Sequence, residues 1–328
     1  MRYALGIDGG GSKCDAALVD ETGAVVGWGR GGPIHIFYDP PEAIAASFRD
    51  AVAGVLAGRR LEELWVVGST PRHEPSREVL TSAAEIVHYR EAGEVDTAYA
   101  SVQEDWGVIV LAGTGSFVHG RTRDERNLHW GGTGPVLNDY GSAYEIGLRG
   151  LRAAFMSHWT ESRRTVLAKA IPAALHVKDL GAVFHMVYVE NMNRRQIAAL
   201  AKVVNDEAER GDRVALECVL KAADEMAANA ADMIRELHME GSAVPVIAIG
   251  GVAQRSGIWW ERVCERIAAV APGMRPLMPR VQPATGGALI GLREMGVPWT
   301  PELVDRLAET EREMRPGGGK NGEGDAGS

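Results

Sequence analysis

The sequence predicts an α/β protein of two lobes, each organised around an antiparallel meander of three strands that opens on a glycine-rich turn. The chain has 328 residues, which is more than one compact core usually holds and favours two lobes. Its 40 glycines, about 12% against a usual value of about 7%, lie mainly in short runs, a pattern typical of tight backbone turns near ligands. Two of these glycine turns lie about 105 residues apart in similar strand patterns.

The first lobe is predicted to begin with strands and to continue with alternating helices and strands. Apolar runs separated by turn residues predict a meander over residues 3–30, with its glycine turn at 8–12. Pro41 and Glu42 are typical of the first turn of a helix, which the apolar spacing extends to Leu56. The lobe is completed by a buried strand at 64–67, a helix over 76–85 and a strand at 86–89.

The second meander has the same layout as the first. Residues 106–112 form a strongly apolar strand, 113–116 its glycine turn, and two further strands follow at 117–119 and 128–130. In both meanders the third strand ends in Trp-Gly. This agreement indicates an ancient duplication, with two unrelated hairpins as the alternative.

From residue 142 onward the chain is predicted to be mostly helical. The expected elements are helices at 144–155, 162–170, 194–209 and 212–238, a strand at 244–249, a helix at 258–270, and a last core helix that starts at 283. Residues 315–328 are expected to be a disordered tail. The expected division is a lobe of residues 1–105 and a larger lobe of 106–314 with a helical insertion at about 156–240.

Composition excludes several classes of function. The 44 acidic residues exceed the 35 basic ones, and the net charge of −9 works against a nucleic-acid partner. No stretch approaches the ~20 apolar residues of a membrane span and no basic leader precedes the first strand, so we expect a cytoplasmic protein without a membrane partner. Cys14, Cys218 and Cys264 lack the spacing of a zinc site or a disulfide framework.

Asp8 gives the first glycine turn a specific chemistry. Glycine allows backbone N–H groups to approach and bind oxyanions such as phosphate. A carboxylate among those groups would repel phosphate unless a divalent cation such as Mg²⁺ lies between them, so Asp8 is a candidate metal ligand, with an ordinary turn residue as the alternative. Residues 6–13 lack the Gly-Lys-Ser/Thr ending of a P-loop, and Val118 replaces the third glycine of a dinucleotide fingerprint.

Six short motifs occur in an order that is specific enough to compare with a known family. They are Gly6-Ile7-Asp8-Gly9-Gly10-Gly11-Ser12-Lys13, Leu111-Ala112-Gly113-Thr114-Gly115-Ser116, Gly131-Gly132-Thr133-Gly134, Asn138-Asp139-Tyr140-Gly141-Ser142-Ala143-Tyr144, Gly250-Gly251 and Gly286-Gly287-Ala288. Together they resemble the BadF/BadG/BcrA/BcrD ATPase family, which belongs to the actin, sugar kinase and Hsp70 ATPase superfamily. The resemblance covers about residues 3–295. It implies a duplicated ribonuclease-H-like fold with ATP in a cleft between two lobes.

The resemblance also implies which residues bind ATP and Mg²⁺. Asp8 would hold Mg²⁺ through water, and Thr114 would lie near the transferred phosphate. The implied ATP-binding residues are Gly9, Gly10, Gly11, Ser12 and Lys13 of a first phosphate loop, Gly113, Thr114, Gly115 and Ser116 of a second, and Gly250, Gly251 and Ser256 near the adenosine.

A kinase of this type needs a carboxylate that takes the proton of the acceptor hydroxyl. Asp96, which is followed by small residues, resembles the family's base, and Glu94 is the alternative. A solvated carboxylate at a helix start is the other interpretation of both. The implied substrate-binding residues are His35, Asp96, Gly132, Thr133, Gly134 and Asp139, where Asp139 has a helix cap as its alternative role.

The acceptor end departs from the pattern of the amino-sugar kinases in this family. His35 and Phe117 stand where that pattern has Asn, Thr133 stands for a Trp and Tyr140 for a Glu. We therefore expect a Mg-ATP-dependent kinase of a sugar or amino sugar whose acceptor pocket is altered. The helices between about 150 and 240 could supply an apolar face for a homodimer, or belong wholly to the core.

Two other functions remain alternatives. An ATPase of the BadF/BadG type, which drives electrons into a protein partner through an iron–sulfur cluster, needs thiolate ligands, and no cysteine follows the loop at 113–116 where such activators carry theirs. A catalytically silent sugar or nucleotide sensor would keep the phosphate loops. A DNA-binding regulator is disfavoured, because no helix-turn-helix precedes the strand that begins at Tyr3.

Overall fold

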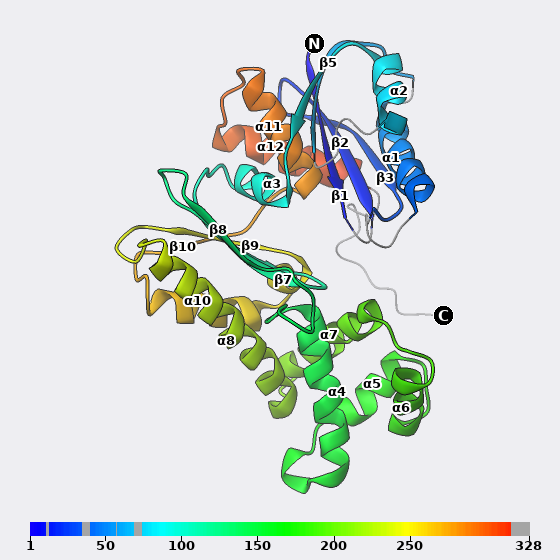
Figure 1. The fold of residues 1–328 in the computed structure, drawn as a ribbon, viewed down its shortest axis with the longest axis vertical. Helices are drawn as coiled ribbons and strands as arrows, with labels where there is room; N and C mark the ends of the chain where they lie inside the picture. Colours follow the sequence, from blue (N-terminus) through cyan, green and yellow to red (C-terminus); the bar gives the residue numbers. More distant parts are fainter. Residues whose placement is uncertain (11–12, 35–39, 57, 69–73, 316–328) are drawn as a thin grey trace. The chain divides into compact units, whose positions relative to one another are not determined.

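The computed structural model describes residues 1–10, 13–34, 40–56, 58–68 and 74–315 (Figure 1). The chain forms two compact units, one made of Met1–Glu104 together with the segment from Pro279 onward, and one made of Asp105–Met278. The expected boundary near residue 105 is therefore present, but residues 279–314 belong to the first unit and not to the second lobe. Apart from Arg315, the expected tail lies outside the described residues.

The first unit contains a five-stranded sheet with the order β3-β2-β1-β4-β5. Strands β1, β2 and β3 form the predicted antiparallel meander, while β4 and β5 run parallel to β1. The strand bounds are β1 Tyr3–Gly9, β2 Cys14–Asp20, β3 Val25–Gly31, β4 Leu61–Gly68 and β5 Ala84–Glu91. The helices of this unit are α1 Pro41–Leu56, α2 Glu74–Ala83, α3 Glu94–Ser101, α11 Pro283–Glu294 and α12 Pro301–Met314.

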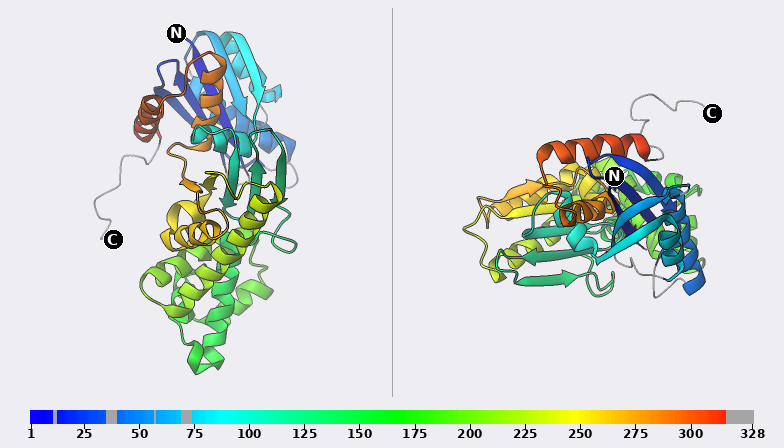
Figure 2. Two further views of the ribbon diagram at one scale, coloured as in Figure 1. Left: turned by 90° about the vertical axis from the view of Figure 1, so that its left-hand side faces the viewer. Right: turned by 90° about the horizontal axis from the view of Figure 1, so that it is seen from above.

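Helices cover both faces of this sheet (Figure 2). Alternate residues of β1 point to opposite faces, so both faces carry apolar side chains that a helix layer buries. Leu5 and Ile7 belong to the core formed with α1, and Ala4 belongs to the core formed with α11. A Cβ at Gly6 would lie only 1.8 Å from the carbonyl oxygen of Ala284, so glycine lets α11 approach β1 closely.

The Gly286-Gly287-Ala288 motif is part of the same packing. A Cβ at Gly286 would lie 2.6 Å from the carbonyl oxygen of Thr97 in α3, and one at Gly287 would lie 3.2 Å from Cα of Gly6. Helix α11 therefore connects β1 with α3, the elements that carry Asp8 and Asp96. The sequence prediction that α11 is the last core helix was wrong, because α12 buries Leu303, Val304, Leu307 and Ala308, which repeat at helical spacing.

The second unit repeats the arrangement of the first. Its sheet has the order β10-β9-β6-β7-β8, with β6, β7 and β8 antiparallel and β9 and β10 parallel to β6. The bounds are β6 Gly107–Ala112, β7 Ser116–Arg121, β8 Asn127–Gly131, β9 Pro245–Ile249 and β10 Arg275–Leu277. A three-stranded meander followed by two parallel strands thus occurs twice, which confirms the duplicated ribonuclease-H-like fold.

Helices make up most of the rest of the second unit. They are α4 Ala143–Trp159, η1 Glu161–Arg163, α5 Leu167–Ala174, α6 Leu180–Tyr188, α7 Arg194–Glu209, α8 Arg213–Glu236, α9 Gly251–Arg255 and α10 Gly257–Ala268. Helix α8 packs against β6 and β7, where a Cβ at Gly120 would lie 2.4 Å from Cδ1 of Leu237. Within the part of the chain described here, no helix is both long and apolar enough to cross a bilayer.

The predicted helix at 162–170 was wrong in its start, and α6 and β10 were not predicted. The hydroxyl of Thr165 and the backbone N–H of Val166 both donate to the carboxylate of Asp212, which is the N-cap of α8. These bonds fix the short link between η1 and α5, in which residues 164 and 165 are not helical. They join residues 46 or 47 positions apart, so local sequence patterns do not reveal them.

Candidate active site

The first glycine turn follows β1 and is tightly closed. The N–H of Gly10 donates to the carbonyl of Lys13 at 2.9 Å, and the carbonyl of Gly10 accepts from Ile34 at 2.8 Å. Gly11 and Ser12 of the expected phosphate loop lie outside the described residues. The described part of the turn shows that Gly9, Gly10 and Lys13 lie at one end of the sheet.

A group of charged side chains lies beside this turn. Asp15 is almost fully buried and accepts hydrogen bonds from Arg30 at 2.6 and 3.2 Å. Lys13 Nζ also bonds to Asp15, so the lysine expected at the phosphates has a carboxylate partner in this structure. The two cations compensate the buried charge of Asp15.

Asp8 is a carboxylate without such compensation. Burial raises the pKa of Asp8 to about 6, the charge of Asp15 adds to that shift, and Lys13 opposes it. No hydrogen bond reaches its carboxylate from the residues that the structure describes. A half-buried carboxylate with this environment favours a cationic partner, and an oxygen donor suits a hard cation such as Mg²⁺.

The donor set around Asp8 is small. Among the described residues, no three His, Cys, Asp or Glu side chains come together closely enough to hold a metal ion. Mg²⁺ in phosphoryl-transfer sites is commonly held by one or two carboxylates together with substrate phosphates and water. Asp8 therefore fits a Mg²⁺ that arrives with a nucleotide better than a resident ion with several protein ligands.

Helix α3 carries the two candidate bases. Burial of its carboxyl group and the nearby charge of Asp8 raise the pKa of Glu94 to about 7, although much of the residue's surface is open to solvent. The carboxylate of Asp96 accepts the N–H of Gly93 at 3.2 Å, as a residue in the first turn of a helix often does. The structure thus gives both carboxylates defined surroundings, and the choice between them remains a prediction.

The second glycine turn, Gly113–Ser116, joins β6 to β7. The N–H of Ala143, the first residue of α4, donates to the carbonyl of Gly113 at 2.8 Å. A Cβ at Gly250 would lie 2.4 Å from the carbonyl oxygen of Ala112 and 3.0 Å from the backbone nitrogen of Gly113. The second glycine turn and the expected adenosine motif therefore lie next to each other in the same unit. Both are at the N-terminal end of the long helix α4, where the helix dipole favours an anion.

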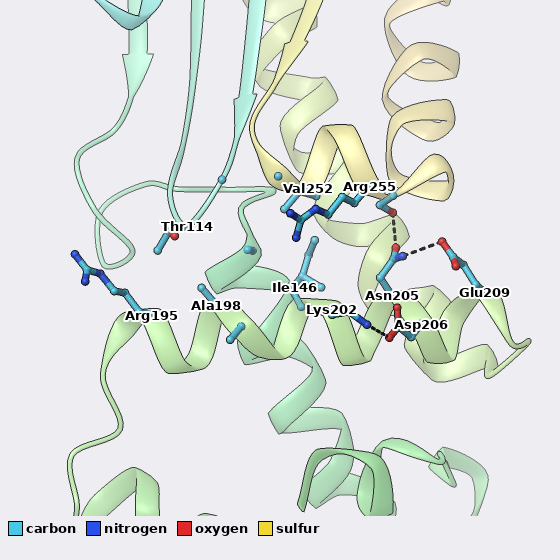
Figure 3. A pocket seen from close by; sticks show the side chains of 16 residues that line it. Thr114, Ile146, Arg195, Ala198, Lys202, Asn205, Asp206, Glu209, Val252 and Arg255 are labelled. Carbon is cyan, nitrogen blue, oxygen red and sulfur yellow. Dashed lines mark hydrogen bonds and ion pairs between the residues drawn. The ribbon is translucent and has the colours of Figure 1, made fainter. Parts of the chain in front are cut away.

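A pocket with a volume of about 690 Å³ opens beside this turn (Figure 3). Its size and its mixture of apolar and polar walls are typical of a small-molecule site. The lining includes Gly113, Thr114, Gly251 and Ser256 of the expected ATP-binding set. Helix α7 contributes a further side of the pocket through Arg195, Ala198, Lys202, Asn205, Asp206 and Glu209.

Hydrogen bonds fix the polar side chains of the pocket. Ser256 is buried, and its hydroxyl donates to Oδ1 of Asn205 while accepting the N–H of Trp259 at 3.2 Å. Nδ2 of Asn205 donates to Glu209 at 2.9 Å, as Figure 3 shows. Ile146 and Val252 provide apolar surface. The pocket thus offers apolar contact together with an ordered polar group.

The expected acceptor-binding residues of this unit lie in the loop after β8. Gly132 and Thr133 are exposed, and Gly132 and Gly134 have φ angles of 69° and 94°, which favour glycine. His35 lies outside the described residues. Phe117 packs its ring 4.7 Å from that of His129. The described part of this loop is therefore accessible to a ligand.

Asp139 is almost fully buried and is engaged within the protein. Its carboxylate accepts the N–H of Ser116 at 3.3 Å and Nη2 of Arg194 at 2.5 Å. The helix-cap role considered for Asp139 belongs to Ser142, whose hydroxyl accepts the N–H of Glu145 at 3.2 Å. Burial raises the pKa of Asp139, an effect that Ser116 and Arg194 oppose.

Sequence reasoning missed the contribution of α7 to the pocket. Ala198, Lys202, Asn205 and Glu209 recur at helical spacing, which was a signal that they share a face. Nothing local indicated that this face lies opposite Gly251 and not in solvent. The participation of Arg194 was missed for the same reason.

The chain is similar to known proteins over most of its length. A model of the BadF/BadG/BcrA/BcrD ATPase family matches residues 5–291. The N-acetylmuramic acid/N-acetylglucosamine kinase of Clostridium acetobutylicum is 25% identical over 304 residues, which cover 90% of this chain and 99% of that protein. The N-acetyl-D-glucosamine kinase of Dictyostelium discoideum is 24% identical over 312 residues, 88% of this chain and 97% of that protein.

A solved structure supports the fold. A ROK family glucokinase from Streptomyces griseus, crystallised with glucose and AMPPNP, aligns over 89% of this chain and 98% of its own, with a TM-score of 0.54 and 16% identity. At that identity the likeness concerns the arrangement of strands and helices. It agrees with the duplicated sheet order described above.

Proposed function

The chain belongs to the BadF/BadG/BcrA/BcrD ATPase family, and from that premise we propose that it is a Mg-ATP-dependent kinase that phosphorylates a hydroxyl of an amino sugar. The observation that carries the proposal is the pocket in which Gly113 and Thr114 meet Gly251 and Ser256. Two nearly full-length relatives act, by name, on N-acetylated amino sugars, which supports that acceptor class.

In this proposal the pocket along α7 holds the nucleoside and the Gly113–Ser116 turn binds the phosphates through backbone N–H groups. Asp8 would hold Mg²⁺ through water, and the N–H groups of the first glycine turn would bind phosphate. When bound, Mg²⁺ neutralises negative charge on the phosphates. Lys13 would contribute by compensating the negative charge of Asp15, which would otherwise repel phosphate.

The proton of the acceptor hydroxyl needs a carboxylate in the reaction. We assign this role to Asp96, with Glu94 as the alternative. The pKa of Glu94, raised to about 7, is suited to a group that takes a proton and releases it near neutral pH. The charge of Asp8 contributes to the raised pKa of Glu94, so a cation at Asp8 would favour the ionised form of Glu94.

The test is ADP formation with Mg-ATP, measured without an acceptor and with N-acetylglucosamine, N-acetylmuramic acid, glucosamine and glucose. Turnover that requires one N-acetylated sugar and is lost in Asp96→Asn supports the proposal, whereas loss only in Glu94→Gln moves the base to Glu94. ADP formation that is equal without any acceptor contradicts a kinase and favours an ATPase that acts on a protein partner. ATP binding without turnover favours a sensor.

The positions of the cysteines disfavour the electron-transfer alternative, because none lies between the loop at 113–116 and Cys218. Cys14, Cys218 and Cys264 are free, and burial raises the pKa of each thiol, to about 12 for Cys14 and about 11 for the other two. Iron–sulfur clusters are held by thiolates. We further propose that the kinase works in the cytoplasm, where ATP is supplied, without a nucleic-acid partner; a homodimer stays a prediction.

A further inference from the structure

Arg194 lies at the start of α7, a position that the structure defines closely. Asn193 is the N-cap, and it exchanges two hydrogen bonds with Gln196, at 2.8 and 3.1 Å. This capping box fixes the backbone at the start of the helix, and with it the direction in which the Arg194 side chain points. From there the Arg194 guanidinium reaches Asp139, with 2.5 Å between Nη2 and Oδ2.

The guanidinium lies directly against the second glycine turn. A Cβ at Gly115 would be 2.3 Å from Nη2 of Arg194 and 3.0 Å from Oδ2 of Asp139. Glycine at position 115 therefore leaves the space that the ion pair occupies. The same carboxylate accepts the N–H of Ser116, so turn, aspartate and arginine form one connected group.

The two members of the ion pair differ in exposure, and this difference has a chemical consequence. The side chain of Asp139 is 2% exposed, while that of Arg194 is 42% exposed. Among the residues that the structure describes, Asp139 is the one hydrogen-bond partner of Arg194. A guanidinium has five N–H donors, so most of them remain available to a ligand, and a buried partner holds the group in place.

We propose that Arg194 binds a terminal phosphate of the nucleotide at the Gly113–Ser116 turn and that Asp139 is the residue that positions it; this inference rests on the proposed kinase function. A planar cation with several donors matches the oxygens of a phosphate. The backbone of the same turn and the N-terminal end of α4 also favour an anion there. Asp139, which we expected to contact the sugar, acts in this view on the phosphate through Arg194.

The role of Arg194 in the reaction follows from the movement of charge. The acceptor oxygen forms a bond to the γ-phosphorus, the bond from that phosphorus to the β–γ bridging oxygen breaks, and the acceptor proton goes to the catalytic carboxylate. Negative charge on the leaving ADP and on the transferred phosphoryl is stabilised by fixed positive donors. Arg194 supplies such a donor without reorganisation, because Asp139 already holds it.

The variants Arg194→Gln, Arg194→Lys and Asp139→Asn test the inference, with Arg210→Gln as a matched control. Arg210 is the C-cap at the other end of α7, and its exposed guanidinium pairs with Glu207, whose side chain is 11% exposed, so its variant removes the same charge and the same type of contact. Asn suits position 139 because its backbone has a φ of 97°, a conformation that Asn tolerates better than most residues. Thermal unfolding shows whether each variant is folded.

Calorimetric binding of AMP, ADP and ATP gives the first readout. We expect Arg194→Gln to leave the Kd of AMP unchanged and to raise that of ATP by about 10- to 100-fold, the usual range for a hydrogen bond to a charged group. With a working acceptor, kcat should fall by about 100- to 1,000-fold. Arg194→Lys should recover ATP affinity more than kcat, because Lys keeps the charge but not the planar group of donors. Asp139→Asn should raise the Kd of ATP and lower kcat as Arg194→Gln does, but by smaller factors.

Three results overturn the inference. Equal weakening of AMP and ATP would make Arg194 a structural residue of the pocket. Unchanged nucleotide affinity with a raised KM for the acceptor would place Arg194 on the acceptor instead. A wild-type protein that binds no nucleotide would overturn the proposed function as well, whereas the first two results overturn this inference alone.

Discussion

Glutamine in place of Glu94 tests how this carboxylate takes part in the reaction. Burial and the charge of Asp8 raise the pKa of Glu94 from 4.5 to about 7. A group with that pKa is ionised in about a tenth of the molecules at about pH 6 and in about nine tenths at about pH 8. If turnover needs the ionised form, kcat/KM of the wild type rises about tenfold over this range.

The assay is the initial rate of ADP formation across that pH range, at subsaturating acceptor and fixed free Mg²⁺. The Glu94→Gln variant should lose the rise near pH 7, because Gln does not titrate. Loss of turnover in Asp96→Asn, combined with a flat Glu94→Gln profile, assigns proton transfer to Asp96 and the pH dependence to Glu94. A wild-type profile that is flat between about pH 6 and 8 would refute the reasoning, as would a Glu94→Gln profile that still rises.

A direct titration separates the electrostatic argument from catalysis. Carbon NMR of the side-chain carboxyl in the protein without nucleotide should give a pKa of about 7 for Glu94. Asp8→Asn should lower that pKa, because ionised Glu94 then no longer faces a like charge. An unchanged pKa in Asp8→Asn would mean that the two carboxylates do not interact.

Three further predictions concern packing, the nucleoside pocket and Mg²⁺. Gly6→Ala should lower the free energy of unfolding by about 1–3 kcal/mol or more, because its Cβ would meet the backbone of Ala284. The control Gly54→Ala in α1, whose Cβ would lie 3.7 Å from its nearest neighbour, should be neutral or stabilising. Denaturant unfolding compares the two variants, and equal effects would contradict the packing argument. Asn205→Ala should weaken the binding of AMP and of ATP by the same factor, about 2- to 10-fold, since it removes the partner of Ser256 but no phosphate contact. Calorimetry measures both affinities, and a loss of affinity confined to ATP would contradict a nucleoside pocket. Asp8→Asn should raise the Mg²⁺ concentration needed for half-maximal turnover, and a titration with unchanged midpoint would exclude Asp8 as the metal ligand.

Local patterns were sufficient for much of the fold. Both meanders, the helix over 41–56 and the helix over 194–209 follow from residue periodicity, turn residues and caps, which act between neighbours along the chain. The predicted duplication was confirmed because the same order of apolar runs and glycine turns directs the same strand pairing twice. Errors occurred where a distant carboxylate decided the backbone, as Asp212 does before α5.

The sequence by itself therefore determined the two meanders and their glycine turns, and it predicted that these turns bind phosphate, because strand alternation and glycine's lack of a Cβ are local properties. Only the tertiary structure decided which side chains share a site. Arg194 meets Asp139 across 55 positions, Asn205 meets Ser256 across 51, and Glu94 feels the charge of Asp8. Charge and burial depend on distance in space, and that distance is set by how the helices pack on the sheets.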